Sequence, residues 1–147
     1  MTWQPSAALA TLRRRAQLLA TIREFFASRD VLEVETPLLC SAGVTDPALE
    51  AMTVDTGDSL DAPRYLQTSP EYAMKRLLAA HGEAVYQVAR AFRDGEAGSR
   101  HNPEFTLLEW YRPGFDAQQL MDEVEQLLRA CLEHRDVSRT SYRALFL

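Results

Sequence analysis

The chain has 147 residues, 46% of them hydrophobic and 25% charged, which is enough for one globular domain with an ordinary core. Its formal net charge of -5 excludes binding to nucleic acid through general electrostatics, because neutralising phosphates takes a clustered excess of Lys and Arg. The two cysteines, Cys40 and Cys131, form no CxxC pair, and no apolar run approaches the roughly 18 to 20 residues that span a bilayer. We therefore expect a cytoplasmic protein with reduced thiols, no signal peptide and no membrane segment.

The first predicted element is a helix over residues 7–29. Apolar residues recur there every three or four positions, which places them on one stripe of a helix, and Ser6 is a candidate N-cap. Residues 31–37 alternate apolar Leu32 and Val34 with acidic residues, which predicts a strand with one buried face that ends at Pro37. Residues 41–63 are rich in Gly, Pro, Asp and Ser, and we expect a loop there with a short strand at 49–54.

A second helix is predicted over residues 70–81. Ser69 suits its N-cap, Pro70 suits its first position, and Gly82 suits its exit. Two strands follow, over residues 84–93 and 104–111, because both stretches alternate in hydropathy. In the first of them we expect Tyr86, Val88 and Phe92 to share one face.

The last predicted helix begins after Asp116, which forms a capping box with Gln119, and its apolar stripe runs to about Glu133. The final residues 138–147 end on apolar side chains without a terminating signal. We therefore expect a chain that represents part of a longer domain.

The connection between the two long strands carries the most chemistry. Arg93 lies at the end of one strand, and Arg100 and His101 lie near the start of the next, so their donors are suited to holding phosphate oxygens. Phe105 is spaced so that a planar base can stack between its ring and an arginine. These features suit a nucleotide such as ATP, although spacing alone favours a solvated loop beside a core aromatic.

Three stretches, in the same order, resemble the motifs of a known family. "FR" at 92–93 followed by "RHNPEFTLLEW" resembles motif 2 of class II aminoacyl-tRNA synthetases, within about 88–113, and "LEVETPLL" resembles motif 1, within about 8–40. "TSPEYAMKRLL" is similar to the start of the amino-acid pocket of lysyl-tRNA synthetases. The resemblance implies an α+β fold in which an antiparallel sheet is flanked by helices, and a homodimer formed through the motif 1 region.

The lysyl enzymes carry an anticodon-binding domain before motif 1, and residues 1–147 contain none. The chain looks most like the free-standing paralogues of lysyl-tRNA synthetase, which activate (R)-beta-lysine with ATP and Mg²⁺ and transfer it to a lysine of elongation factor P. Two alternatives stay open: a catalytic fragment of a lysyl-tRNA synthetase that charges tRNA with lysine, and a non-catalytic dimerising or binding module derived from one.

The resemblance also implies roles for particular residues. Arg93 would be the catalytic residue at the reacting phosphate. The implied ATP-binding residues are Arg93, Asp94, Gly95, Arg100, His101, Asn102 and Phe105. The implied substrate-binding residues are Ser69, Pro70, Glu71, Glu109 and Tyr111, with Glu71 accepting the amino group and the Tyr111 hydroxyl accepting a hydrogen bond from the distal ammonium.

The sequence departs from the family pattern at two points. Motif 2 places a glutamate two residues after its arginine, whereas this chain has Gly95 there and Glu96 next. No motif 3 segment follows residue 135, so the metal ligands are expected beyond Leu147 and none within this chain.

Overall fold

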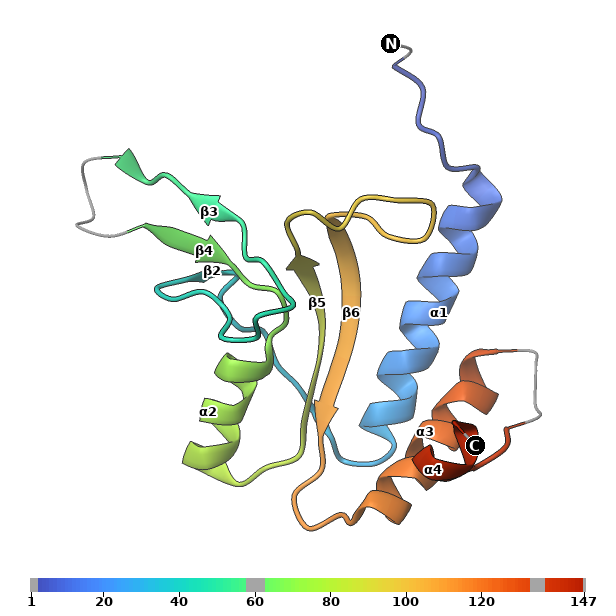
Figure 1. The fold of residues 1–147 in the computed structure, drawn as a ribbon. Coiled ribbons are helices and arrows are strands. Elements are labelled where there is room, and N and C mark those ends of the chain that lie inside the picture. Colours follow the sequence, from blue (N-terminus) through green and yellow to red (C-terminus); the bar gives the residue numbers. More distant parts are fainter. Residues whose placement is uncertain (1–2, 58–62, 133–136, 147) are drawn as a thin grey trace. The chain divides into compact units, whose positions relative to one another are not determined.

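The structure is a computed structural model that describes residues 3–57, 63–132 and 137–146 (Figure 1). The chain divides into two compact units, one formed by Met1–Arg29 with Gly114–Leu147 and the other by Asp30–Pro113. Within the described residues, none of the helices combines the length and apolar character required to cross a membrane.

The first unit is helical and consists of α1 (Leu9–Ala27), α3 (Ala117–Cys131) and α4 (Tyr142–Leu145). The predicted N-terminal helix is confirmed, but Ser6 as its cap is wrong. The N-cap is Ala8, which offers no side-chain hydrogen bond, and Ser6 lies two residues before it. The predicted capping box is confirmed, because Asp116 Oδ1 accepts from the Gln119 backbone and Gln119 Oε1 accepts from the Asp116 backbone.

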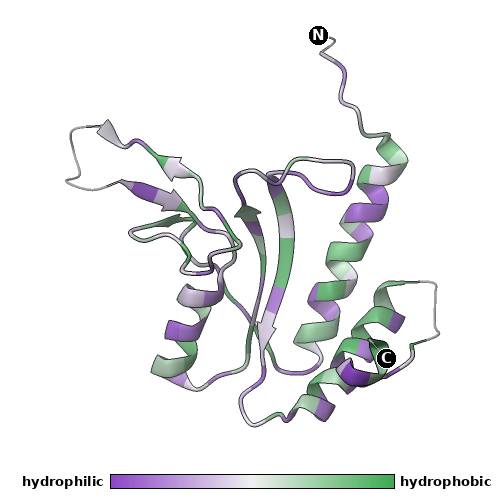
Figure 2. Ribbon diagram, viewed as in Figure 1, coloured by the Kyte–Doolittle hydropathy of each residue, from purple (hydrophilic) through white to green (hydrophobic). Residues whose placement is uncertain are grey.

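Apolar side chains of α1 and α3 form the core of this unit. Ile22, Phe25, Phe26 and Leu127 are buried, and Phe25 and Phe26 meet edge to face with their ring centroids 5.2 Å apart. Along α3 hydrophobic and hydrophilic residues alternate (Figure 2). Its predicted stripe is only partly buried, since Leu120 and Leu128 are exposed. The end of the stripe, near Glu133, lies outside the described residues.

The second unit contains a three-stranded sheet in the order β1-β5-β6, built from β1 (Leu32–Glu33), β5 (Val85–Phe92) and β6 (Glu104–Tyr111). The strands β5 and β6 pair antiparallel over their full length, as predicted. The expectation of a purely antiparallel sheet is wrong, because β1 pairs with β5 in parallel. A parallel pair needs a crossover between its strands, and here the connection from β1 to β5 includes the second sheet and α2.

The more buried face of β5 is the one opposite Tyr86, Val88 and Phe92, the residues predicted to share a face. Val85, Gln87, Ala89 and Ala91 are buried together with Tyr86, whereas Val88 and Phe92 are only half-buried. Hydropathy misleads here because Gln87 accepts a hydrogen bond from Thr36 Oγ1 at 2.9 Å, which satisfies part of its buried amide.

The strand predicted over residues 31–37 is also shorter than expected. It is limited to the two residues of β1, and Leu32 on it is 59% exposed rather than buried.

A second sheet has the antiparallel order β2-β4-β3, formed by β2 (Leu39–Cys40), β3 (Thr53–Val54) and β4 (Arg64–Leu66). The helix α2 (Glu71–His81) follows β4, and Met74 on it is fully buried. Gly82 ends α2 in the left-handed conformation at φ 69°, which confirms the predicted exit.

Candidate functional site

Four of the residues predicted to bind substrates surround one cavity of about 510 Å³ in the second unit. We call it the acidic cavity, and its lining residues are Val44, Thr45, Asp46, Leu49, Thr68, Ser69, Glu71, Tyr72, Arg93, Leu107 and Glu109. They come from the segment after β2, the first turn of α2, the end of β5 and one face of β6. The structure therefore brings Ser69, Glu71, Arg93 and Glu109 together, although they are spread over 41 positions of the sequence (109 − 69 + 1).

A second cavity, of about 490 Å³, lies at the connection between β5 and β6. We call it the loop cavity, and its lining residues are Arg93, Gly95, Glu96, Ala97 and His101. Arg93 lines both cavities and is the residue that they share.

The guanidinium of Arg93 is held on several sides. Its Nε donates to the carbonyl oxygen of Thr68 at 3.4 Å, and its Nη1 lies 3.7 Å from a carboxylate oxygen of Glu96. Its Cζ atom is 5.1 Å from the centroid of the Phe105 ring, which is within cation–π range. Contacts on three sides limit the rotamers of a long side chain, so Arg93 is directed before any ligand binds.

The backbone of the loop is shaped mainly by its own hydrogen bonds. The Asp94 backbone N–H donates to the carbonyl of Glu50 at 2.9 Å, and the Gly95 N–H donates to Asp94 Oδ1 at 2.8 Å. Gly95 has φ 72°, a conformation that glycine adopts without the cost borne by other residues. The backbone conformation at position 95 therefore favours glycine. The carboxylate of the next residue, Glu96, faces Arg93.

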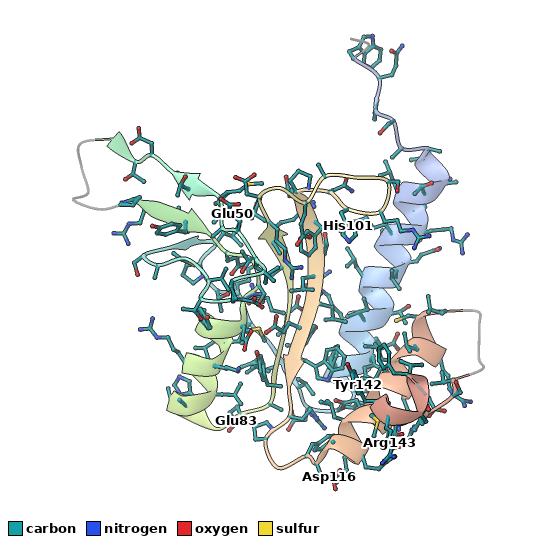
Figure 3. The ribbon with its side chains drawn as sticks, viewed as in Figure 1. Glu50, Glu83, His101, Asp116, Tyr142 and Arg143 are labelled. Carbon is teal, nitrogen blue, oxygen red and sulfur yellow. The ribbon has the colours of Figure 1, made fainter. Side chains whose placement is uncertain are left out.

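The remaining ATP-binding candidates lie in or beside this loop. His101 lines the loop cavity and is exposed, and Figure 3 shows it on the connection between β5 and β6. Arg100 and Asn102 are also exposed, but they do not belong to the cavity lining. Phe105 touches the site through Arg93.

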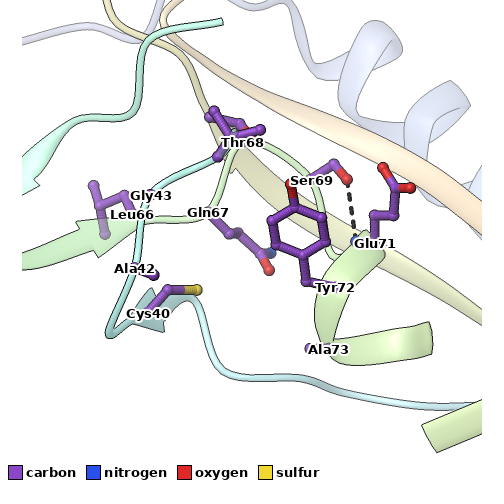
Figure 4. Close-up of a pocket in the computed structure, with 11 residues that line it drawn as sticks. Cys40, Ala42, Gly43, Leu66, Gln67, Thr68, Ser69, Glu71, Tyr72 and Ala73 are labelled. Atoms are coloured by element: carbon purple, nitrogen blue, oxygen red, sulfur yellow. Dashed lines mark hydrogen bonds between the residues drawn. The ribbon is translucent and has the colours of Figure 1, made fainter. Parts of the chain in front are cut away.

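Glu71 stands at the start of α2. The Ser69 hydroxyl accepts from the Glu71 backbone N–H at 3.1 Å and Ser69 lines the cavity (Figure 4). The prediction of Ser69 as N-cap and Pro70 as first helical residue is wrong by one position, because the N-cap is Pro70 and α2 begins at Glu71. The Glu71 carboxylate pairs with the ammonium group of Lys75 one turn along α2. That hydrogen bond, together with the charge of Glu71, raises the pKa of Lys75 above its usual value. The carboxylate predicted to accept a substrate ammonium thus already holds an ammonium from its own helix.

Glu109 and Tyr111 lie two residues apart on β6, and therefore on the same face of the sheet as Phe105 and Leu107. The Tyr111 hydroxyl donates to Glu109 Oε1 at 2.6 Å. Burial, and then the hydrogen bond to Glu109, raise the pKa of Tyr111, so the phenol is neutral at physiological pH. Tyr111 does not itself line the acidic cavity and reaches it through Glu109.

Pro70 has a structural role at the start of α2. Its side chain is fully buried and precedes the first residue of α2, where its fixed φ suits the helix start. No role in contacting a ligand follows from that burial.

The sequence analysis missed several lining residues, above all Thr45, Thr68 and Tyr72. Thr45 lies in the segment 41–63, where weak periodicity gave no signal, and Thr68 precedes the predicted helix. Tyr72 follows Glu71 directly and also lines a small pocket of about 50 Å³, shown in Figure 4. The adjacency of Tyr72 to Glu71 was the only hint in the sequence.

Among the residues that the structure describes, no group of three or more His, Cys, Asp or Glu side chains is placed to hold a metal ion. The carboxylates of the acidic cavity are instead engaged by Lys75 and Tyr111. The described residues therefore do not fit a magnesium site of their own.

The profile of class II tRNA synthetases (D, K and N) matches residues 1–143 of the chain. Proteins called elongation factor P--(R)-beta-lysine ligase are similar to it. The one from Pseudoalteromonas translucida is 52% identical over 147 residues, which is 98% of this chain and 45% of that protein. Those from Yersinia enterocolitica and Proteus mirabilis are also 52% identical, each over 99% of this chain and 46% of the relative. The chain thus spans a little under half the length of these relatives.

Proposed function

Because the chain belongs to the class II tRNA synthetase family (D, K and N), we propose that it carries substrate sites of an ATP-dependent ligase. The proposed enzyme activates (R)-beta-lysine as an aminoacyl-adenylate and transfers it to a lysine side chain of elongation factor P. The observation that carries the proposal is that Arg93 lines both cavities. The names of the similar proteins support the choice of amino acid and acceptor.

In the first step, a carboxylate oxygen of the amino acid attacks the alpha-phosphorus of ATP, and the bond from that phosphorus to the bridging oxygen of pyrophosphate breaks. Two anionic groups must approach each other, and Arg93 offers its guanidinium to both. A positioned cation that gains charge contacts in the transition state accelerates the step without a covalent nucleophile. The contacts of Arg93 with Thr68 and Glu96 preset its direction.

ATP would occupy the loop cavity. His101 lines it, Arg100 extends from the same turn to reach the outer phosphates, and Phe105 lies beneath Arg93 for stacking of the adenine. Asp94, Gly95 and Asn102 would shape the loop and contact the nucleotide through backbone and amide groups. Glu96, rather than a side chain at position 95, is suited to accept from the adenine amino group.

The amino acid would occupy the acidic cavity. Glu71 and Glu109 supply negative charge for a substrate that carries two ammonium groups, and charge-assisted hydrogen bonds of this kind are stronger than neutral ones. Tyr111 fixes the Glu109 carboxylate by donating to it. Ser69 and Pro70 set the start of α2 and so the position of Glu71.

In the second step, the amine of an acceptor lysine attacks the carbonyl carbon of the adenylate, an amide forms, and AMP leaves. A net charge of -5 favours a protein acceptor over tRNA. We further propose that the enzyme works in the cytoplasm as a homodimer through the motif 1 region, with Mg²⁺ bound by residues outside this chain.

Mass spectrometry of elongation factor P tests the proposal. The full-length gene product, given ATP and (R)-beta-lysine, is expected to add the mass of one beta-lysyl group to a single lysine. Unmodified elongation factor P, together with lysylation of tRNA by the same preparation, would identify a lysyl-tRNA synthetase instead. If neither lysine nor (R)-beta-lysine supports ATP-pyrophosphate exchange, the protein is a non-catalytic module.

A further inference from the structure

The segment 42–46 follows β2, its residues Val44, Thr45 and Asp46 line the acidic cavity, and Thr45 is hydrogen-bonded to α2, which also lines the cavity. The Thr45 hydroxyl and the Tyr72 hydroxyl are 2.7 Å apart, and the Thr45 backbone N–H donates to the same Tyr72 oxygen at 3.4 Å. Tyr72 belongs to the first turn of α2, directly after Glu71. One phenolic oxygen therefore makes two contacts with one residue of the segment.

The rest of the segment is also constrained. Gly43 lies so close to the second sheet that a Cβ atom there would be 3.4 Å from a Tyr65 ring carbon. Beyond Thr45, the Asp46 carboxylate accepts from the Ala48 backbone N–H at 2.9 Å, which closes a tight turn. The hydrogen bonds to Tyr72 join the segment to α2.

Tyr72 also lines two spaces. Its side chain lines the acidic cavity of about 510 Å³ and the small pocket of about 50 Å³. The two spaces also share Val44, Thr68, Ser69 and Glu71. In Figure 4 the Tyr72 ring stands among the labelled residues Gln67, Ser69 and Glu71, with Cys40 and Ala42 in the same view.

We propose that the Thr45–Tyr72 contact is a latch that fixes the width of the acidic cavity, and that Tyr72 thereby determines which diamino acid the cavity accepts. Lysine and (R)-beta-lysine differ in the carbon that bears the amino group nearest the carboxylate. A shift of the wall beside Glu71 changes how well each amino group reaches that carboxylate. The specificity part of this inference rests on the proposed function, whereas the latch itself does not.

Hydrogen exchange of the full-length protein tests the latch without any substrate. The variants Tyr72→Phe and Thr45→Val each remove one hydroxyl and keep the shape of the side chain. Each is expected to speed exchange of the backbone amides of residues 42–46 by about three- to tenfold, the effect of losing one hydrogen bond. Thr45→Ser keeps the hydroxyl and is the matched control, with exchange as in the wild type. Unchanged exchange in both Tyr72→Phe and Thr45→Val would overturn the latch.

Kinetics test the specificity part. In ATP-pyrophosphate exchange, both hydroxyl-removing variants are expected to lower the ratio of kcat/KM for (R)-beta-lysine over lysine by threefold or more. The double variant should be no worse than Tyr72→Phe alone, because loss of the Tyr72 hydroxyl already removes both contacts with Thr45. An unchanged ratio, or additive effects, would overturn the assignment of specificity to Tyr72. A wild-type protein that activates neither amino acid would refute the proposed function and this specificity, while the exchange measurement still decides on the latch.

Discussion

The acidic cavity and the loop cavity, both in the unit of residues 30–113, are built in different ways. In the acidic cavity two of the charged residues lie on regular elements, Glu71 on α2 and Glu109 on β6, and the carboxylates of both already have a partner. The loop cavity is formed by the connection between β5 and β6, and of the predicted phosphate-binding residues there, Arg100 and His101, both are exposed and only His101 lines the cavity. The first is preorganised by side-chain contacts and the second by backbone hydrogen bonds.

This difference has a consequence for substitutions. A side chain held by partners on rigid elements loses little freedom when a ligand binds, so its removal costs nearly the full strength of its contact. A loop side chain that is free before binding must be ordered, which offsets part of what it contributes. Arg93 belongs to both cavities and is already directed, so its substitution should have the largest effect.

Arg93→Ala is expected to lower the rate of ATP-pyrophosphate exchange by about 10²- to 10³-fold, the usual effect of removing one preorganised donor to a transition state. The matched control is Arg90→Ala, because Arg90 lies on the same strand but is exposed and pairs with Glu104. That control should retain wild-type rates. A decrease of less than fivefold in the exchange rate of Arg93→Ala would contradict the proposal that Arg93 acts on the substrates of both cavities.

Glu71→Gln is expected to raise KM for the amino acid by about 10- to 100-fold while leaving KM for ATP within about twofold. A hydrogen bond to a charged group contributes about 1.5–3 kcal/mol, and the amide cannot supply the charge. Glu83→Gln, an exposed glutamate just after the end of α2, is the matched control. Equal effects on both KM values would contradict the division of substrates between the cavities.

Gly95→Ala tests the backbone of the loop cavity. A left-handed residue with a Cβ atom costs roughly 1–2 kcal/mol, and no atom lies within 4 Å of a Cβ at Gly95, so the cost is conformational alone. The loop is expected to distort, with a severalfold weaker Kd for ATP measured by calorimetry. Gly98→Ala is the control, because Gly98 lies in the same loop, has equal space and does not have a positive φ in the left-handed range. Equal affinities for the two variants would show that the loop does not depend on Gly95.

The elements of this unit that sequence alone predicts are those with local signals. The end of α2 at Gly82 follows from capping chemistry, and its start was predicted to within one residue from Ser69 and Pro70. The short strands β2 and β4 have only two and three residues, too few for any periodicity, and they exist because they pair with each other. Burial of Gln87 likewise depends on Thr36, 51 positions away.

The same limit applies to the site. Arg93, His101 and Glu71 belong to motifs whose residue types indicate phosphate or ammonium binding, and the structure places them at the two cavities. Thr45 was not predictable because its relevance arises only from a contact with Tyr72, 27 residues away. The pairing of Glu71 with Lys75 has a local signal, the i,i+4 spacing on a helix, which the sequence analysis did not use.

Lys75→Met is expected to have the smallest effect, and it should improve rather than weaken binding of the amino acid. The ammonium of Lys75 occupies the carboxylate that a substrate ammonium has to reach, so the substrate must displace it. Both partners are about half exposed, and such pairs are weak, so KM for the amino acid is expected to fall by only about two- to fivefold. Arg76→Met removes an exposed charge from the next position and should leave KM unchanged. A rise in KM for Lys75→Met would mean that Lys75 orients Glu71 for the substrate, and the acidic cavity would then be more fully preorganised than its carboxylates alone imply.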